Sequence, residues 1–157
     1  MNERILNTLT AMGFQPEAVE DACYAFHYEG VNFLYLPSDD DDFLNIAVPA
    51  IWDIDDKNSL VVYKIMDMLN ATAKYVKANM YADEMWLFYE RELIGDENLE
   101  EVITRMIVHL EGTLIFFRNT LDEIANTDNS DTDDDGSPDE TDETDETDEI
   151  NEEEEQL

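Results

Sequence analysis

The sequence contains one cysteine, Cys23, among 157 residues, so the chain has no internal disulfide. A single cysteine within an apolar run is most often a small buried side chain. Basic residues are also scarce: 8 lysines and arginines stand against 41 aspartates and glutamates, for a formal net charge of −33. Such a charge repels nucleic-acid phosphates and anionic lipid surfaces, so we expect no nucleic-acid or membrane partner, and protein partners that are basic or neutral.

The sequence lacks the combinations of residues that most catalytic and metal-binding sites need. The two histidines, His27 and His109, are far apart in the sequence, and no cysteine or aspartate lies near them at metal-ligand spacing. Five glycines leave little material for a phosphate-binding loop, and no Ser-His-Asp arrangement is indicated. We therefore predict no catalytic residues, no enzymatic activity and no cofactor.

Long apolar runs are absent as well. No window approaches the roughly 18 apolar residues of a membrane span, and the first residues lack the basic region and apolar stretch of a secretory signal. With a single cysteine, this pattern is typical of a reducing compartment, and we expect a cytoplasmic protein.

Acidic residues are concentrated at the C-terminal end. Residues 127–157 hold 17 acidic and no basic residues, whereas residues 1–126 hold 24 acidic and all 8 basic residues, about −16. The Asp-Glu-Thr repeats of residues 139–149 have almost no apolar side chains to offset the entropy of ordering. We predict a folded domain at residues 1–126 and a disordered acidic tail at 127–157, whose simplest role is to keep the protein soluble.

One stretch of this tail, residues 131–142, fits the template of a calcium-binding loop, with Gly136 at its sixth position. The candidate oxygen ligands are Asp131, Asp133, Asp135, Asp139 and Asp142. Against this hypothesis, the last position holds Asp rather than the longer Glu, Pro138 replaces the usual apolar residue, and no flanking helices are predicted. We expect weak cation association, and a calcium- or cation-responsive protein is the alternative function.

Apolar periodicity predicts three helices: a short one with Ile5, Leu9 and Met12 on its apolar face that stops at Gly13, and two longer ones over residues 60–76 and 99–124. Three extended runs between residues 22 and 52 precede the middle helix, and one or two short strands within residues 80–93 follow it. Pro49, inside the third run, indicates an edge, a bulge or a strand end. The order α-β-β-β-α-β-β-α predicts an α+β fold, with an antiparallel sheet of four to five strands packed against three helices.

Some large apolar side chains cannot share this core. Val108, Ile115 and Phe116 lie more than about 100° from the centre of the last helix's apolar stripe, so either another element covers them or they form a dimer or partner surface. Trp86 and Phe88 point to the opposite face of their strand from Met85, Leu87 and Tyr89, so both faces of the sheet are apolar. Trp86, Phe88, Val108, Ile115 and Phe116 are the candidate partner-binding residues.

Several short segments resemble the YbjN-like family, whose members have the type III secretion chaperone-like fold. They are Tyr28–Leu34 in the first hairpin, Asn70–Lys77 at the end of the middle helix, and Trp86–Glu90 together with Asn98–Glu101. The resemblance covers roughly residues 1–124 and implies a small, acidic, often dimeric bacterial protein that binds another protein or modulates a regulatory pathway. Members of the family carry no established active site, so the resemblance assigns no catalytic residue, and it leaves the tail unexplained.

The sequence therefore predicts a non-enzymatic protein-binding module, chaperone-like or regulatory. An apolar sheet or helix face would bind a protein partner or client, or a second copy of the chain in a homodimer. A third hypothesis, a DNA mimic, would require carboxylates of the folded domain to lie at phosphate-like spacing.

Overall fold

The computed structural model describes residues 1–19, 23–38 and 43–130, with side chains described as far as residue 125. The predicted calcium loop at 131–142 lies outside these residues. The described elements, in order, are α1 (Asn2–Ala11), β1 (Glu17–Ala18), β2 (Tyr24–Tyr28), β3 (Val31–Tyr35), β4 (Phe43–Asp53), α2 (Ser59–Thr72), β5 (Val76–Tyr81), β6 (Glu84–Glu92) and α3 (Leu99–Ser130). This order confirms the α+β prediction, and the sheet gains one strand that the sequence pattern did not indicate, the two-residue β1.

The six strands form one antiparallel sheet in the order β1-β2-β3-β4-β6-β5. Two hairpins have two-residue loops, Glu29–Gly30 between β2 and β3 and Ala82–Asp83 between β5 and β6. Both residues of each loop have positive φ, as in the type I′ turns whose twist matches that of the flanking strands. Because α2 lies between β4 and β5 in the chain, β6 is the strand that returns to pair with β4.

The irregularity expected at Pro49 is a bulge in a central strand. The pairing of β4 with β6 shifts between Val48 and Trp52, and Ala50 adopts a φ of 50°. Beyond the bulge, Trp52 pairs with Met85 in the ladder and its ring contacts Phe117 of α3, with centroids 5.8 Å apart. The bulge therefore accommodates the proline and directs Trp52 into the core.

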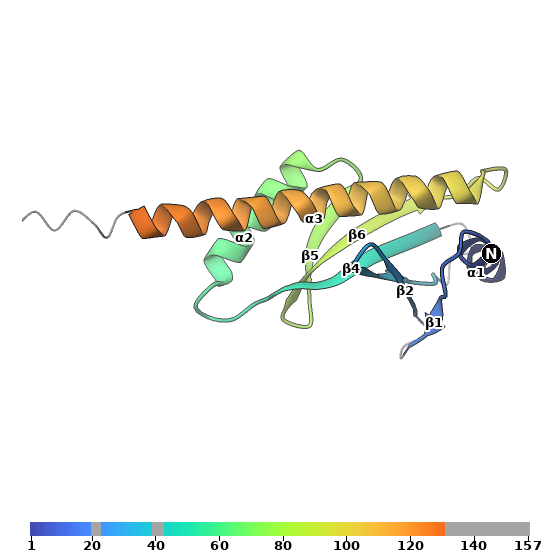
Figure 1. The fold of residues 1–157 in the computed structure, drawn as a ribbon, viewed down its shortest axis with the longest axis horizontal. Coiled ribbons are helices and arrows are strands. Elements are labelled where there is room, and N and C mark those ends of the chain that lie inside the picture. The colour runs from blue at the N-terminus through green and yellow to red at the C-terminus, as the bar shows by residue number, and fades with distance from the viewer. Residues whose placement is uncertain (20–22, 39–42, 131–157) are drawn as a thin grey trace, which may run out of the picture.

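The core lies between the sheet and the long helix α3, which runs along one face of the sheet (Figure 1). The apolar stripe predicted for this helix is buried, from Leu99 to Phe117. The smaller helices flank it: α2 packs beside β5, and α1 packs against α3. On α1, Ile5 and Leu9 are fully buried, and Asn2 accepts a 2.6 Å hydrogen bond from the hydroxyl of Tyr35.

The side chain of Asn70 connects α2 to the edge strand β5 through two hydrogen bonds. Its Oδ1 accepts a 2.7 Å hydrogen bond from the Ala78 backbone N–H, and its Nδ2 donates a 3.0 Å hydrogen bond to the Ala78 carbonyl. Both backbone groups of Ala78 are thereby satisfied on the side of β5 that has no neighbouring strand.

Helix α3 continues to Ser130, past the predicted boundary at residue 126. The division into a domain at 1–126 and a tail at 127–157 stays a prediction. Across the part of the chain that the structure describes, none of the helices combines the length and the apolar content needed to cross a membrane.

Candidate functional site

The two faces of β6 have different surroundings. Met85, Leu87 and Tyr89 are buried on the face that α3 covers. Trp86 and Phe88 lie on the opposite face and are half-buried, and none of the described helices lies over them (Figure 1). We call this uncovered surface the open sheet face.

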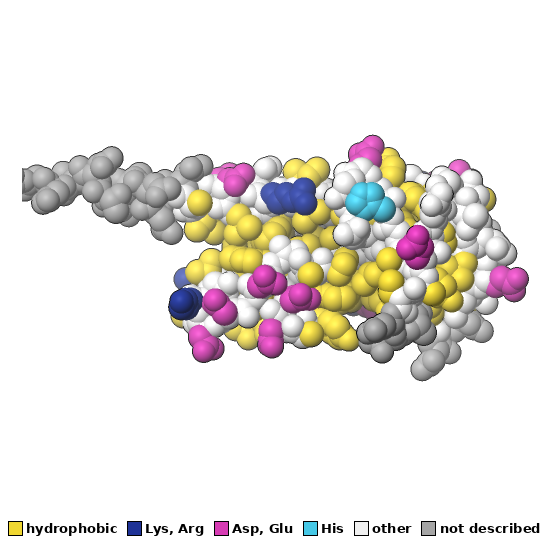
Figure 2. Space-filling model, turned by 60° about the horizontal axis from the view of Figure 1, so that its bottom comes forward, with side chains coloured by type: hydrophobic (Ala, Val, Ile, Leu, Met, Phe, Trp, Pro, Cys, Tyr) yellow, Lys and Arg dark blue, Asp and Glu magenta, His cyan; other side chains and the backbone are white. Residues whose placement is uncertain are grey.

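Aromatic side chains form a row on the open sheet face. The rings of Trp86 and Phe88 are stacked, with centroids 5.9 Å apart. The ring of Tyr81 of β5 also contacts Trp86, with centroids 5.0 Å apart. Phe88 is paired with Ala47 of β4, and Ala47 with Leu34 of β3, so apolar side chains continue across this face of the sheet, although Ala47 itself is fully buried. Figure 2 shows hydrophobic side chains across the side of the molecule that it brings forward, with acidic side chains among them.

Carboxylates border the aromatic pair. Glu84, Glu90 and Glu92 alternate with the buried residues of β6, so they share the open sheet face with Trp86 and Phe88. The Nζ of Lys77 lies 3.2 Å from Glu90, and Trp86 Nε1 donates a 3.1 Å hydrogen bond to Glu84. The open sheet face thus combines an apolar centre with acidic ends, and the first of these carboxylates holds the indole ring in place.

The other three candidate residues lie on a separate surface. Val108 and Ile115 are 59% and 56% exposed and Phe116 is 36% exposed, on the side of α3 that faces away from the sheet. We call the exposed line of Arg105, Val108, Gly112, Ile115, Phe116 and Asn119 the outer stripe of α3. The five candidate residues therefore do not form one site, because the sheet and its core separate the aromatic pair of β6 from the outer stripe.

A shallow groove runs along each side of the outer stripe. One, of about 240 Å³, lies between α3 and the connection from α2 to β5, and Val108, Gly112 and Phe116 contribute to its wall. The other, of about 250 Å³, lies between α3 and the segment around Phe14 and Tyr28. Val108 borders both grooves.

The titratable groups near these grooves are few. Burial raises the pKa of the Glu111 carboxyl above its usual range, and the negative charge of Glu29 raises it further. The charge of Glu29 is also the main cause of the raised pKa of the Tyr28 phenol. On the other side of α3, the ring of His109 contacts Tyr75 and Tyr89 edge-on, which gives this histidine a packing role.

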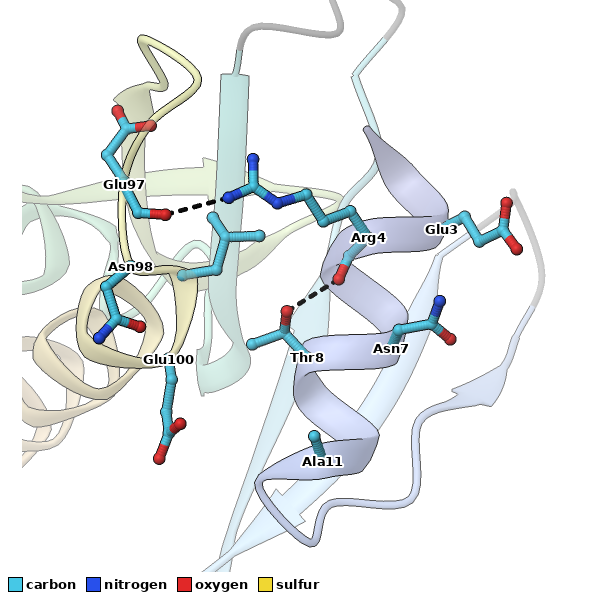
Figure 3. A pocket seen from close by; sticks show the side chains of 9 residues that line it. Glu3, Arg4, Asn7, Thr8, Ala11, Glu97, Asn98 and Glu100 are labelled. Atoms are coloured by element: carbon cyan, nitrogen blue, oxygen red, sulfur yellow. Dashed lines mark hydrogen bonds between the residues drawn. The ribbon is translucent and has the colours of Figure 1, made fainter.

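A cavity of about 670 Å³, open to solvent, lies where α1 meets the start of α3 (Figure 3). The guanidinium of Arg4 donates hydrogen bonds to the carbonyls of Gly95, at 3.3 Å, and Glu97, at 3.0 Å. In Figure 3 the carboxyl groups of Glu3, Glu97 and Glu100 point in different directions. The guanidinium of Arg4 is thus bonded to backbone carbonyls, and the three carboxyl groups do not converge on one point. We therefore interpret this cavity as the contact between α1 and the start of α3, without the arrangement of groups that a reaction site needs.

Glu97 stabilises the turn before α3. Its carboxylate accepts hydrogen bonds from the backbone N–H groups of Ile94, at 2.6 Å, and Gly95, at 2.8 Å. These bonds, Ile94 first, hold the pKa of Glu97 below its usual range, and Arg91, 3.7 Å away, acts in the same direction.

Within the described ranges no three histidine, cysteine or acidic side chains come together as a metal site would require. His27 Nδ1 lies 2.9 Å from the Oδ1 of its cross-strand neighbour Asn32. Both histidines therefore have partners within the fold.

The sequence analysis did not name several residues of the open sheet face. Glu84 and Glu90 alternate with Trp86 and Phe88 at the two-residue strand period, and that signal was available. Ala47 and Leu34 could not be assigned to this face from the sequence, because only the pairing register places Ala47 beside Phe88 and Leu34 beside Ala47.

Comparison with solved structures finds a crystal structure of YbjN, a candidate transcription regulator from E. coli, that superposes with a TM-score of 0.57. The match covers 77% of this chain and 93% of that chain, at 10% sequence identity. The fold is similar to that of YbjN. This finding confirms the YbjN-like part of the resemblance at the level of fold, and the type III secretion chaperone-like part stays a prediction.

Two sequence comparisons add little. The profile of the UBA/TS-N domain family matches residues 1–32, about a fifth of the chain, which here form α1, β1, β2 and the start of β3. A search of curated protein sequences finds no match.

Proposed function

We propose that this protein is a non-catalytic protein-binding module, regulatory or chaperone-like. Its open sheet face binds a segment of a partner protein that carries apolar side chains flanked by lysine or arginine. The observation that carries this proposal is the stacked, half-buried pair Trp86 and Phe88, which lies between carboxylates on one strand and on the face of the sheet that the described helices leave uncovered.

Aromatic side chains suit this role for a physical reason. A tryptophan or phenylalanine buries roughly 150–250 Å² when it is fully covered, and such residues at the centre of an interface contribute much of the binding free energy. Trp86 and Phe88 are already stacked and Trp86 is hydrogen-bonded to Glu84, so little side-chain entropy remains to be lost on binding.

The carboxylates select the charge of the partner. A basic segment is drawn toward Glu84, Glu90 and Glu92, whereas an acidic segment is repelled by them and by the formal net charge of −33. Charges at the border of an interface act mainly on the association rate and on specificity, and salt weakens them.

The similarity to YbjN supports a regulatory or interaction role, since YbjN is described as a transcription regulator candidate. The type III secretion chaperone-like role and a bacterial origin remain proposals from the family resemblance, and a cytoplasmic location remains a proposal from the single cysteine and the absence of a signal-like first segment. The calcium-responsive alternative, through Asp131, Asp133, Asp135, Asp139 and Asp142, also remains a prediction.

A labelled peptide tests the proposal directly. A peptide that alternates leucine with lysine is titrated with the full-length protein, and a peptide with serine in place of leucine controls for charge alone. We expect Trp86→Ser with Phe88→Ser to weaken binding of the leucine peptide at least about tenfold. The matched control is Leu60→Ser, which removes an exposed apolar side chain from α2. Equal binding of the two peptides, or unchanged binding by the double variant, would contradict the proposal.

A further inference from the structure

The middle of the outer stripe of α3 holds a glycine that the fold does not need. Gly112 is exposed and lies inside a continuous helix, where glycine is less favourable than alanine. Unlike Gly13, Gly30 and Gly95, it does not have a positive φ, and a Cβ built on it meets no atom within 4 Å. Nothing within the described part of the chain requires its small size, so a close approach from outside the chain would explain it.

The residues on either side of Gly112 are arranged symmetrically. Val108 and Phe116 lie four positions away in each direction, about 6 Å along the helix axis, and Arg105 and Asn119 lie seven positions away. On a helix with 100° per residue, all four point within about 40° of the direction of Gly112. Two antiparallel copies of α3 crossing at Gly112 would place each Val108 against the Phe116 of the other copy, as an isologous two-fold contact requires.

Charge also favours a second copy at this surface. Residues 102–121 contain one acidic residue, Glu111, and two basic residues, Arg105 and Arg118, in a chain whose formal net charge is −33. The repulsion between two copies is therefore smallest where α3 faces α3, and at physiological salt charges more than about 8 Å apart are largely screened. Between Arg105 and Asn119 the outer stripe offers a basic partner no acidic side chain, and the next one in the same direction, Glu101, is paired with Arg105.

The grooves on both sides of α3 add surface that a crossing helix could bury. Val108 and Phe116 stand at the edge of the groove beside the α2–β5 connection, and Val108 also borders the groove beside Phe14 and Tyr28. Tyr75, close to that first groove, is 65% exposed with a φ of 70°, a conformation that is costly for a residue other than glycine.

We propose that two copies of this chain pair through the outer stripes of their α3 helices, antiparallel, with the two-fold axis at Gly112. Val108, Ile115 and Phe116 of each copy are buried in this contact. Because α3 and the open sheet face lie on opposite sides of the molecule, pairing leaves both open sheet faces uncovered and makes the assembly bivalent for a partner.

The first test is the mass of the full-length protein by sedimentation equilibrium. We expect a dimer that Val108→Glu converts to a monomer, since two carboxylates would be buried near the axis. Val108 is 59% exposed, so the substitution leaves the core of each copy intact. The matched control is Leu60→Glu, on an exposed position of α2, which should leave the dimer unchanged. A wild-type monomer, or a dimer unaffected by Val108→Glu, would overturn the proposal and leave the stripe to a different protein.

A second variant distinguishes the effect of Gly112 on the contact between two copies from its effect on the stability of one copy. Gly112→Gln replaces glycine with a better helix former, so a chain that does not pair at Gly112 should become more resistant to unfolding and keep its mass. If Gly112 is the point of closest approach, the added side chain holds the helices apart and weakens dimerisation at least about fivefold. An unchanged dimerisation constant would refute a contact at Gly112.

Cross-linking tests the two-fold geometry, in a Cys23→Ser background. Gly112→Cys should form a disulfide between two copies, because the axis brings the two positions together. Val108→Cys alone should not, since its two copies would lie about 12 Å apart along the helices. A mixture of Val108→Cys and Phe116→Cys proteins should cross-link. Disulfides from Val108→Cys alone would indicate a parallel arrangement and overturn the proposed one. Partner binding through Trp86 is measured separately, so either proposal can fail without the other.

Discussion

Leu87 and Phe88 are consecutive residues of β6 with opposite surroundings: Leu87 is fully buried against the core, whereas Phe88 stacks on Trp86 at 5.9 Å on the open sheet face. The alternation of side chains along a strand makes this contrast possible within one residue. Adjacent substitutions on β6 should therefore separate stability from partner binding.

We expect Leu87→Ala to lower the free energy of unfolding by about 2–5 kcal/mol, since it leaves a cavity under α3. Phe88→Ser should cost less than about 1.5 kcal/mol, because its ring is only half-buried. Urea denaturation followed by far-UV circular dichroism measures both. Equal losses would show that the open sheet face is covered in the folded protein.

Arg4 joins α1 to the turn before α3 through the carbonyls of Gly95 and Glu97. Arg4→Ala removes both hydrogen bonds, and we expect a loss of about 1–2 kcal/mol in the free energy of unfolding. Lys64→Ala, at an exposed position of α2, is the control and should change it by less than about 0.5 kcal/mol. If the two variants are equally stable, the contacts of Arg4 do not contribute to the folded state.

The β5–β6 turn places two non-glycine residues, Ala82 and Asp83, at φ values of 50° and 63°. Asn-Gly is the preferred pair for a type I′ turn, so Ala82→Asn with Asp83→Gly should raise the free energy of unfolding by about 1 kcal/mol. As a control, Ala71→Gly in α2 introduces glycine where φ is helical and should lower stability by about 0.5–1 kcal/mol. A loss of stability from the Asn-Gly turn would contradict the assigned strain.

The three helices and most strands were predictable because their signals are local, but the middle helix was predicted four residues too long, since α2 ends at Thr72 and β5 begins at Val76. The apolar stripe of α3 gives its buried residues from Leu99 to Phe117 by periodicity alone, and the bulge of β4 is one of the three alternatives that Pro49 indicated. Strand β1 was not predictable, since two exposed residues, Glu17 and Ala18, carry no period and form a strand only because β2 lies beside them.

The candidate surfaces were predictable in part. Trp86, Phe88 and Val108 follow from the periods of a strand and a helix, which show that each points away from its own core face. Their separation into two surfaces does not follow, because it depends on all three described helices leaving the same face of the sheet uncovered. Apolar content shows that a second face exists, but does not show which element, if any, covers it.

Glu111 gives the protein a pH-dependent contribution to stability. Partial burial in the groove between α3 and the segment around Phe14, followed by the charge of Glu29, raises the pKa of the Glu111 carboxyl in the folded state, and Tyr28 and Glu100 line the same groove. A raised folded-state pKa stabilises the fold below the unfolded-state pKa, about 4.3, and this contribution is lost as pH rises through the folded-state value. At pH 7 the ionised Glu111 is therefore unfavourable.

Glu111→Gln removes this charge without changing the shape of the side chain. We expect the variant to be more stable than the wild type at pH 7, by less than about 1 kcal/mol because solvent screens the site, and the difference to shrink toward pH 4. Urea titrations at fixed protein concentration across this pH range measure the difference. Glu92→Gln, an exposed carboxylate at the end of β6, is the control for the general loss of one negative charge. The same gain from both variants at pH 7 would assign the effect to the net charge of the chain rather than to the burial of Glu111.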